Sequence, residues 1–229
     1  MELSLRLKTI AAMVDKCEAV ADIGTDHGYI PIFLIKNDIC KRAIASDINL
    51  GPIEKAKFNI SLENLSAQIA CRLGGGLTTI NPNEVNCSII AGMGGNLIRD
   101  ILLEREEVFK SLDNAILQPV QNPEVLRRFI YERGYSIVDE ELCYDQNKFY
   151  EILKVSYDNK PQQKEEIFYE VGEALINKKH PLIKEYMQYK IERNEKIYEN
   201  IKDDTEAAEQ RKAEVKLKIN KLKELIQCL

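Results

Sequence analysis

Residues 20–30 carry the pattern that most restricts the fold of this chain. The apolar run Val20–Ile23 contains an acid at its end, Asp22, and the chain then turns through Gly24 and Gly28 into an apolar segment. A buried strand, a glycine turn and a helix in this order form the cofactor-binding unit of parallel α/β proteins. The spacing Asp-x-Gly-x-x-x-Gly, without a G-x-G-x-x-G motif, favours S-adenosylmethionine over a dinucleotide.

Short apolar segments alternate with helical ones through the first two thirds of the chain. The expected strands are Ala19–Ile23, Ala43–Asp47, Ile69–Leu73, Cys87–Ala91 and Ala115–Gln118, and the expected helices are residues 3–17, Ile30–Asn37, Ile53–Leu62, Asn96–Leu103 and Glu124–Arg133. Apolar strands separated by helices predict a parallel sheet covered on both faces. Two consecutive strands, Tyr135–Cys143 and Phe149–Val155, then predict a terminal antiparallel hairpin. This order is typical of Rossmann-like class I methyltransferases, which are α/β proteins with a mostly parallel seven-stranded sheet.

The last third of the chain has a different character. A polar linker, DNKPQQ at 158–163, precedes a region without glycine after Gly172 or proline after Pro181. Apolar residues there recur at a spacing of three to four, which predicts two long helices packed as an antiparallel coiled-coil hairpin. Residues 202–205 are the expected helix stop and N-cap, and one continuous helix is the alternative. We therefore expect a methyltransferase domain at 1–157 and a helical extension at 158–229.

Composition restricts the cellular setting. Hydrophobic residues make up 45% and charged residues 30% of the 229 residues, and no segment approaches the roughly 20 apolar residues that span a bilayer. The six cysteines form no Cys-x-x-Cys pair and only two histidines occur. We expect reduced thiols, no metal site, no membrane segment and a cytoplasmic location. The net charge is −5, but nearly half of the 32 Lys and Arg residues follow residue 157, where they form either a solvated helix surface or a phosphate-binding face.

Acids and glycines at successive strand ends outline a cofactor site. Asp22 is placed to reach the ammonium of the methionine moiety, and Asp47, at the end of the second strand, to accept the ribose hydroxyls. The alternatives are an ordinary strand-to-helix turn at Gly24 and a helix cap at Asp47. The residues expected to bind the cofactor are Asp22, Gly24, Thr25, His27, Asp47, Ile48, Gly75, Gly76, Ala91 and Gly92.

The segment after the fourth strand, Ala91–Gly95, offers no ionisable group. It contains neither the Asn/Asp-Pro-Pro-aromatic motif of enzymes that methylate exocyclic amines nor the Pro-Cys nucleophile of cytosine carbon-5 enzymes. Its three glycines leave room for a nucleobase. Any catalytic acid or base must therefore come from another segment.

The nearest polar candidates are in the first turn. A carboxylate at Asp26 would stabilise the positive charge that develops when a ring nitrogen such as adenine N1 is methylated, and Tyr29 would stack on the base. The residues expected to bind the acceptor are Tyr29, Met93, Gly94, Gly95, Gln118 and Asn122. The alternatives are a helix cap for Asp26, a backbone-bonded loop residue for His27, a core aromatic for Tyr29 and a structural turn after Gln118. For Arg6, packing on a helix surface is favoured over a contact with the cofactor pocket or RNA.

Together these motifs resemble the bacterial tRNA adenine-N1 methyltransferases that modify adenine 22. The shared segments are LSLRL, ADIGTDHGYIP, Gly51-Pro52, RLGGGL, IIAGMGG followed by Leu97-Ile98, ILQP and YEIL. The resemblance implies methyl transfer from S-adenosylmethionine, with S-adenosylhomocysteine as product, to adenine N1 of tRNA. It also implies that the helical extension helps to hold tRNA and that Asp26 corresponds to the family's acidic active-site residue.

Beside a mild change in the first turn, where Thr25 and Gly28 replace the family's Ser and Ala, two segments depart from the family pattern. Gly75 stands where the family usually has an aspartate that contacts the adenine amine of the cofactor, which puts cofactor affinity in question. Ser46-Asp47 stands where some members have Gly-Glu, so the acid is kept.

Two alternative functions stay open. One is a catalytically weak scaffold that binds cofactor and RNA, and the other is a methyltransferase for a small molecule or a protein. The oligomeric state is open, and Lys178, Lys179, Lys184 and Lys190 are the lysines expected on the RNA side.

Overall fold

The computed structural model describes residues 3–203 and 205–229. The chain divides into two compact units, Met1–Gln163 and Lys164–Leu229. In the first unit the elements are α1 (Leu5–Ala12), β1 (Cys17–Ile23), α2 (Tyr29–Lys36), β2 (Cys40–Asp47), α3 (Leu50–Leu62), β3 (Ile69–Leu73), the 3₁₀ helix η1 (Gly76–Thr79), β4 (Cys87–Gly94), α4 (Gly95–Glu104), α5 (Glu106–Ser111), β5 (Asn114–Gln121), α6 (Pro123–Glu132), β6 (Tyr135–Asp145) and β7 (Lys148–Tyr157).

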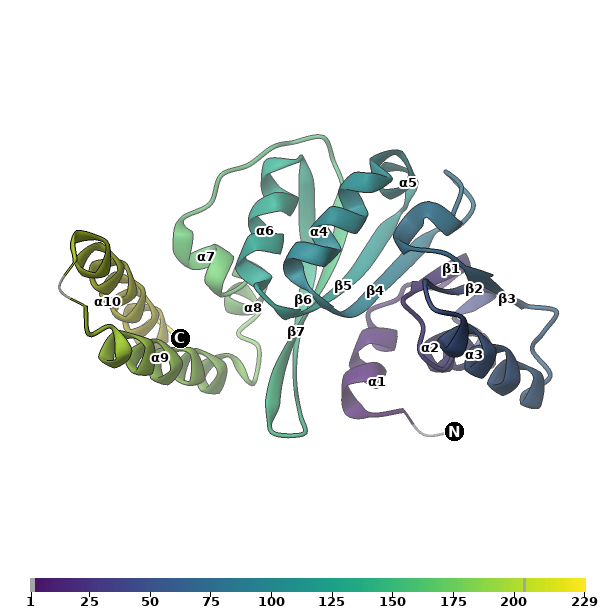
Figure 1. The fold of residues 1–229 in the computed structure, drawn as a ribbon, viewed down its shortest axis with the longest axis horizontal. Coiled ribbons are helices and arrows are strands. Elements are labelled where there is room, and N and C mark those ends of the chain that lie inside the picture. Colours follow the sequence, from purple (N-terminus) through teal and green to yellow (C-terminus); the bar gives the residue numbers. More distant parts are fainter. Residues whose placement is uncertain (1–2, 204) are drawn as a thin grey trace. The chain divides into compact units, whose positions relative to one another are not determined.

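The seven strands form one mixed sheet with the order β3-β2-β1-β4-β5-β7-β6 (Figure 1). β1 to β5 are parallel to one another, whereas β7 pairs antiparallel with both β5 and β6. The predicted α/β class, the parallel sheet and the terminal hairpin are therefore confirmed. Because β1 to β5 run in the same direction, their carboxyl ends and the loops that follow lie on one edge of the sheet.

The two faces of the sheet are covered by different helices. One buried cluster joins the strands to η1, α4, α5 and α6 and contains Leu77, Ile98, Phe109 and Leu126. The other joins them to α1, α2 and α3 and contains Ile10, Ile32 and Ala56. Strands buried on both faces are mostly apolar, and the buried polar residues Asp22, Ser88 and Gln118 are the exceptions in β1, β4 and β5.

Several expected boundaries differ from the structure. The N-terminal helix, expected over 3–17, ends at Ala12. The chain must leave the helix there because β1 begins at Cys17, which lies opposite Cys40 in the parallel pairing of β1 with β2. β4 continues through the glycine segment to Gly94, with register shifts against β5 after Ala91. The expected linker at 158–163 is anchored to the first unit, since the amide of Gln162 donates to the Tyr131 carbonyl at 2.8 Å.

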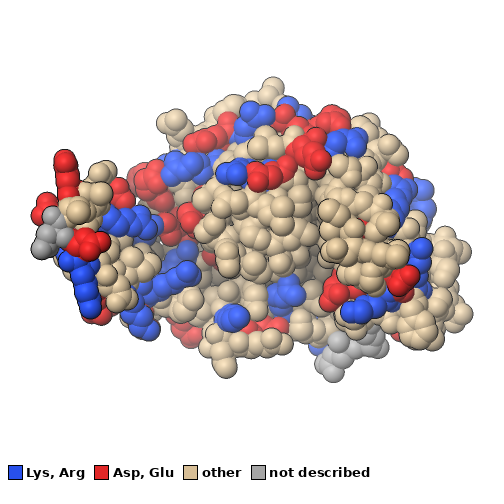
Figure 2. Space-filling model, in the orientation of Figure 1, with Lys and Arg blue, Asp and Glu red and all other residues tan. Residues whose placement is uncertain are grey.

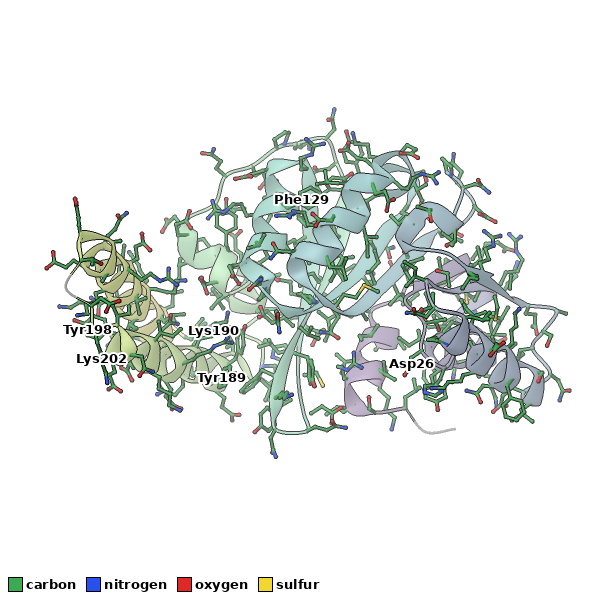
Figure 3. All side chains as sticks on the ribbon, in the orientation of Figure 1. Asp26, Phe129, Tyr189, Lys190, Tyr198 and Lys202 are labelled. Carbon is green, nitrogen blue, oxygen red and sulfur yellow. The ribbon has the colours of Figure 1, made fainter. Side chains whose placement is uncertain are left out.

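The second unit contains α7 (Glu166–Glu170), α8 (Glu173–Asn177), α9 (Ile183–Asn200) and α10 (Glu206–Gln227). Two separate long helices are thus present, as predicted, rather than one continuous helix. The Thr205 side chain caps α10 by accepting from the Ala208 amide, which confirms the predicted N-cap; Asp204 of the predicted turn lies outside the described residues. Figure 3 labels Tyr189, Lys190, Tyr198 and Lys202 along α9 and its end.

Ion pairs join the helices of the second unit. The Glu170 carboxylate contacts the ammonium groups of Lys218 and Lys190, and Lys223 pairs with Glu195 at 2.9 Å. The Lys190 side chain is only 13% exposed and its ammonium lies 5.2 Å from the Tyr186 ring centroid. The expectation that Lys190 faces RNA is therefore wrong, because this lysine stabilises contacts between helices; Lys178, Lys179 and Lys184 are exposed.

None of the helices in the described part of the chain is long and apolar enough to cross a membrane. On the face drawn in Figure 2, positive and negative side chains of the first unit are mixed around an uncharged area over α4 and α6. The second unit likewise carries both signs (Figure 2). A local arrangement of charges, rather than a basic total, must therefore govern any binding of nucleic acid.

Candidate cofactor and acceptor site

The turn after β1 is fastened to the neighbouring strand. The amides of Gly24 and Thr25 both donate to the Ser46 carbonyl at 2.8 Å, and the Thr25 hydroxyl accepts from the Gly28 amide at 3.2 Å. Gly24 and Gly28 have φ values of +78° and +70°, a conformation that favours glycine. The chain therefore turns sharply at the carboxyl end of β1 and begins α2 with Gly28 as its N-cap.

Gly24 also lies against the end of β4. A Cβ built at this residue would be 2.2 Å from Cε of Met93, a distance that real Cβ atoms do not show. The end of the Met93 side chain thus occupies the space that a Cβ at residue 24 would need, and the φ of +78° favours glycine at this turn.

Asp22 is a buried acid at the end of β1. Its side chain is 7% exposed, and this burial raises its pKa to about 6, partly offset by the hydrogen bond from Thr25. A buried carboxylate is stable in its charged form only beside a cation or several donors. An ammonium group from a ligand would supply that cation, so the residue fits the methionine end of S-adenosylmethionine.

Asp47 is the last residue of β2 and Ile48 follows it, next to the loop after β3. The Asp47 Oδ1 atom accepts from the Asn49 amide at 2.7 Å, which orders the turn into α3. The Ile48 side chain is 71% exposed, and a Cβ built at Gly75 would lie 3.5 Å from its Cδ1 atom. One carboxylate oxygen of Asp47 thus accepts a hydrogen bond like that of a helix cap. Ile48 and Gly75 together offer a flat apolar surface suited to a purine ring.

Arg72 holds the glycine-rich loop that follows β3, residues 74–79. The sequence did not indicate this role. Its Nη1 atom donates to the Thr79 carbonyl at 2.6 Å, and its guanidinium pairs with the Glu84 carboxylate through both nitrogens. The bonds from Arg72 lower the pKa of Glu84 to about 2. The Arg72–Glu84 pair therefore closes the loop from Gly74 to Thr79 at its base.

Asp26, labelled in Figure 3, lies in the same turn between Gly24 and Gly28. Its side chain is 73% exposed and contacts the His27 Nε2 atom at 3.3 Å. The helix cap considered for Asp26 is contradicted, since α2 begins at Gly28 without a side-chain cap. The carboxylate is thus held at the surface of the site without a structural role in α2.

His27 and Tyr29 form an aromatic pair beside this carboxylate. Their rings are stacked, with centroids 4.9 Å apart and planes 11° apart, and both side chains are half-buried. The His27 carbonyl accepts from the Asn59 side chain at 2.9 Å, so both its backbone and its ring are anchored. The turn therefore presents an acid next to a fixed aromatic surface.

The glycines after Ala91 have different surroundings. Gly92 is exposed with φ +78°, and a Cβ at Gly94 would meet nothing within 4 Å. At Gly95 a Cβ would lie 2.3 Å from the Asn122 carbonyl oxygen. Gly95 is therefore needed for packing of α4 against the loop before α6, whereas Gly92 and Gly94 leave open space at the site.

Gln118 and Arg6 meet beside Gly92. The Gln118 side chain is fully buried; its Nε2 atom donates to the Pro119 carbonyl at 2.9 Å, and its Oε1 atom accepts from Arg6 Nη1 at 2.7 Å. The expectation of simple surface packing for Arg6 is wrong, because its guanidinium points inward to the end of β5. Asn122 remains exposed with φ 52° at the start of α6.

Most of the predicted site residues thus lie at the edge of the sheet formed by the carboxyl ends of β1 to β5. Gly24 lies against Ser46 and Met93, and Asp22 is bonded to Thr25 of the same turn. The edge also includes Arg72, for which the sequence indicated no function, and Arg6, for which surface packing was favoured. Within residues 3–203 and 205–229, no group of three or more His, Cys, Asp and Glu side chains could hold a metal ion.

Comparison with known proteins gives the family. The sequence model of the tRNA (adenine(22)-N(1))-methyltransferase family matches residues 20–224. The protein of that name from Bacillus subtilis is 31% identical over 232 residues, covering 99% of this chain and 98% of the relative. This is the family that the sequence motifs of the chain resemble.

Solved structures lead to the same family. A Streptococcus pneumoniae protein described as a putative tRNA (m1A22) methyltransferase in complex with S-adenosyl-L-methionine has 30% identity and a TM-score of 0.87, covering 98% of this chain and 100% of its own. An M. capricolum structure bound to S-adenosyl-homocysteine has 28% identity and a TM-score of 0.84, covering 99% of both chains. The chain therefore belongs to the tRNA (adenine(22)-N(1))-methyltransferase family.

Proposed function

We propose that this chain transfers the methyl group of S-adenosylmethionine to N1 of adenine 22 in tRNA. The observation that supports this most directly is the first turn, where a buried acid, Asp22, and an exposed acid, Asp26, are separated by a glycine at φ +78°. The buried acid suits the cofactor ammonium and the exposed acid suits the methyl acceptor. Since the substrate is tRNA, the proposed place of action is the cytoplasm.

The cofactor residues divide by the part of the ligand that they suit. Asp22 would accept from the ammonium, Asp47 from the ribose hydroxyls, and Ile48 with Gly75 would cover the adenine. Gly24, Thr25, His27, Gly76, Ala91 and Gly92 complete the proposed set. The cofactor supplies an electrophilic methyl group on a sulfonium, and S-adenosylhomocysteine is the product.

Asp26 is proposed to act by its charge. Methylation at N1 uses the nitrogen lone pair, so no proton has to leave N1 and the adenine ring becomes cationic. A carboxylate about 4 Å from that ring would stabilise the charge by roughly 4 kcal/mol at an effective dielectric constant near 20. The bound base would displace water from Asp26, which strengthens this interaction during the reaction.

The acceptor base needs a surface on which to lie. The stacked pair His27–Tyr29 offers an aromatic face, and the space beside Gly94 has room for a ring. Met93 and Asn122 flank that space in the proposed site. Gln118 and Gly95, which were also expected to bind the acceptor, are buried, so they support neighbouring groups rather than touch the base.

The second unit is proposed to bind the body of the tRNA. Lys178, Lys179 and Lys184 are exposed near the start of α9. A face of this kind neutralises phosphates and makes binding depend on salt. Changing Lys179 and Lys184 to Glu should weaken tRNA binding at least tenfold while leaving cofactor affinity unchanged.

Two measurements separate this proposal from the alternatives. Purified protein with labelled cofactor should methylate tRNA that lacks the modification, and the label should map to adenine 22. Calorimetric titration with S-adenosylmethionine tests the scaffold alternative, which is motivated by Gly75. Tight tRNA binding with weak cofactor binding and little or no turnover would support the scaffold. Turnover on a small molecule without tRNA would support a different substrate class.

A further inference from the structure

The guanidinium of Arg6 is a fixed positive charge beside the proposed acceptor space. It reaches from α1 to the carboxyl ends of β4 and β5, where its Nη1 atom donates to Gln118 at 2.7 Å. Its Cζ atom lies 5.5 Å from the Tyr150 ring centroid, and a Cβ built at Gly92 would be 3.8 Å from Nη1. Three distant segments of the chain therefore converge on this one side chain.

The surroundings of Arg6 orient it strongly. Gln118 is fully buried and both ends of its amide are engaged, so its carbonyl has one orientation toward Arg6. The Arg6 backbone amide donates to the Asp145 carboxylate at 3.2 Å, which fixes the start of α1 against the end of β6. Stacking on Tyr150 adds a cation–π contact. These contacts set the direction of the guanidinium without neutralising its charge.

The other N–H donors of the Arg6 guanidinium form no hydrogen bond within the part of the chain that the structure describes. A guanidinium carries five N–H donors. Among residues 3–203 and 205–229, Arg6 Nε and Nη2 form no hydrogen bond, and no carboxylate forms an ion pair with the guanidinium. A half-buried cation without an anion pays part of its desolvation cost with no compensating charge. An anion supplied by a ligand would complete this site.

We propose that Arg6 binds a phosphate that flanks the target adenosine and so positions the base for methylation. This inference rests on the proposed function. The guanidinium could bind either a phosphate or the edge of the base. Positive charge moves onto the adenine ring during methylation, so a guanidinium bonded to the ring edge would oppose the reaction. A guanidinium on a flanking phosphate neutralises negative charge and matches the fork geometry of phosphate oxygens.

Arg6→Ala tests the proposal when tRNA binding, cofactor binding and turnover are each measured. The dissociation constant for unmodified tRNA should rise about ten- to a hundredfold, as expected for loss of a hydrogen bond between charged groups. The slope of log affinity against log salt should fall by about one. The dissociation constant for S-adenosylmethionine should not change. Arg42→Ala, an exposed arginine near the start of β2, is the matched control and should change none of these quantities.

Gln118→Glu provides an independent variant. The new carboxylate would pair with Arg6 and cancel its charge, so tRNA affinity and the salt slope should fall as in Arg6→Ala while Arg6 stays in place. Arg6→Lys keeps the charge and should keep the salt slope, but it should lower kcat because the ammonium lacks the planar fork. Thermal melting of each variant establishes that the fold is retained.

The outcomes of these measurements test the phosphate contact and the proposed function separately. Unchanged tRNA affinity and salt slope in Arg6→Ala would overturn the phosphate contact, and a matching loss of cofactor affinity would assign Arg6 to the cofactor instead. If wild-type protein binds tRNA with an Arg6-dependent salt slope but transfers no methyl group, the phosphate contact stands and the proposed function fails. If wild-type protein does not bind tRNA, both fail.

Discussion

Gly75 and Ile48 face each other across the ends of β2 and β3. A Cβ built at Gly75 would lie 3.5 Å from Cδ1 of Ile48, which is an ordinary van der Waals distance. Gly75 also has φ −87° and ψ 137°, a conformation open to any residue. The structure therefore accepts a side chain at this position, and glycine is not required by the fold.

Gly75→Asp should tighten binding of S-adenosylmethionine. The new carboxylate would restore an acceptor for the adenine amine, and a hydrogen bond to a charged group corresponds to about a tenfold change in affinity. Isothermal titration calorimetry measures the change. Gly75→Ala controls for backbone stiffening and should leave the affinity near its wild-type value. Equal or weaker binding by Gly75→Asp would show that the cofactor adenine lies elsewhere.

Asp26→Asn should lower kcat by about a hundredfold or more while leaving cofactor affinity unchanged, because it removes a charge that acts mainly in the transition state. Asp26 has no structural role in α2, so the melting temperature should also stay the same. Single-turnover methylation of tRNA measures the rate. Asp38→Asn, an exposed aspartate between α2 and β2, is the matched control. Full activity of Asp26→Asn would remove Asp26 from the mechanism.

Asp22 should make stability and cofactor binding depend on pH. Burial raises its pKa to about 6, against roughly 4 in an unfolded chain. Between these values the folded state holds more protons, so the free energy of unfolding should fall as pH rises from about 4 to 6, by up to about 3 kcal/mol. Asp22→Asn should abolish this fall, as urea titrations across that range would reveal.

Cofactor affinity should change in the opposite direction. The ligand ammonium pairs with ionised Asp22, so affinity for S-adenosylmethionine should rise up to tenfold per pH unit below pH 6 and level off above it. The α-amino group stays charged until about pH 7.7, which sets the upper end of the plateau. Calorimetry at several pH values measures this profile. A flat profile from pH 5 to 7 would argue against the ammonium contact.

Arg127 should be essential for stability. Its side chain is 1% exposed and pairs with Glu140 at 2.7 Å and Glu151 at 2.6 Å, which join α6 to the β6–β7 hairpin. Arg127→Met should cost about 3–5 kcal/mol of unfolding free energy, because two buried carboxylates lose their cation. Replacing Glu140 and Glu151 by Leu as well should restore much of that loss in urea titrations. A loss below 1 kcal/mol for the single variant would contradict this role.

The sequence predicted the sheet well because each buried strand is a continuous apolar run. Ile69–Leu73 was predicted with both of its ends correct, and the terminal hairpin was predicted in the right direction. The helix expected over 3–17 was too long, since only the pairing of Cys17 with Cys40 reveals where β1 begins. The short helix α5 was not predicted, because its six residues contain less than two helical turns of pattern.

The family and its cofactor could be predicted from motifs near the strand ends, but the contacts of single side chains could not. Arg6 and Gln118 are 112 positions apart in the sequence, and Arg72 and Glu84 are joined only through the fold of the glycine loop. Gln118 was expected to touch the base, but the structure engages its amide internally. Pairings of this kind depend on strand order, which a pattern of residue types does not contain.

The most direct test of the central claim maps the methyl group on tRNA. Unmodified tRNA is incubated with S-adenosylmethionine and either wild-type protein or Asp26→Asn at saturating cofactor, and the product nucleoside is identified and located. Wild-type protein should yield N1-methyladenosine at position 22, and Asp26→Asn should form it at least a hundredfold more slowly with unchanged cofactor affinity. A methyl group at another atom or position, or equal rates for the two proteins, would contradict the account.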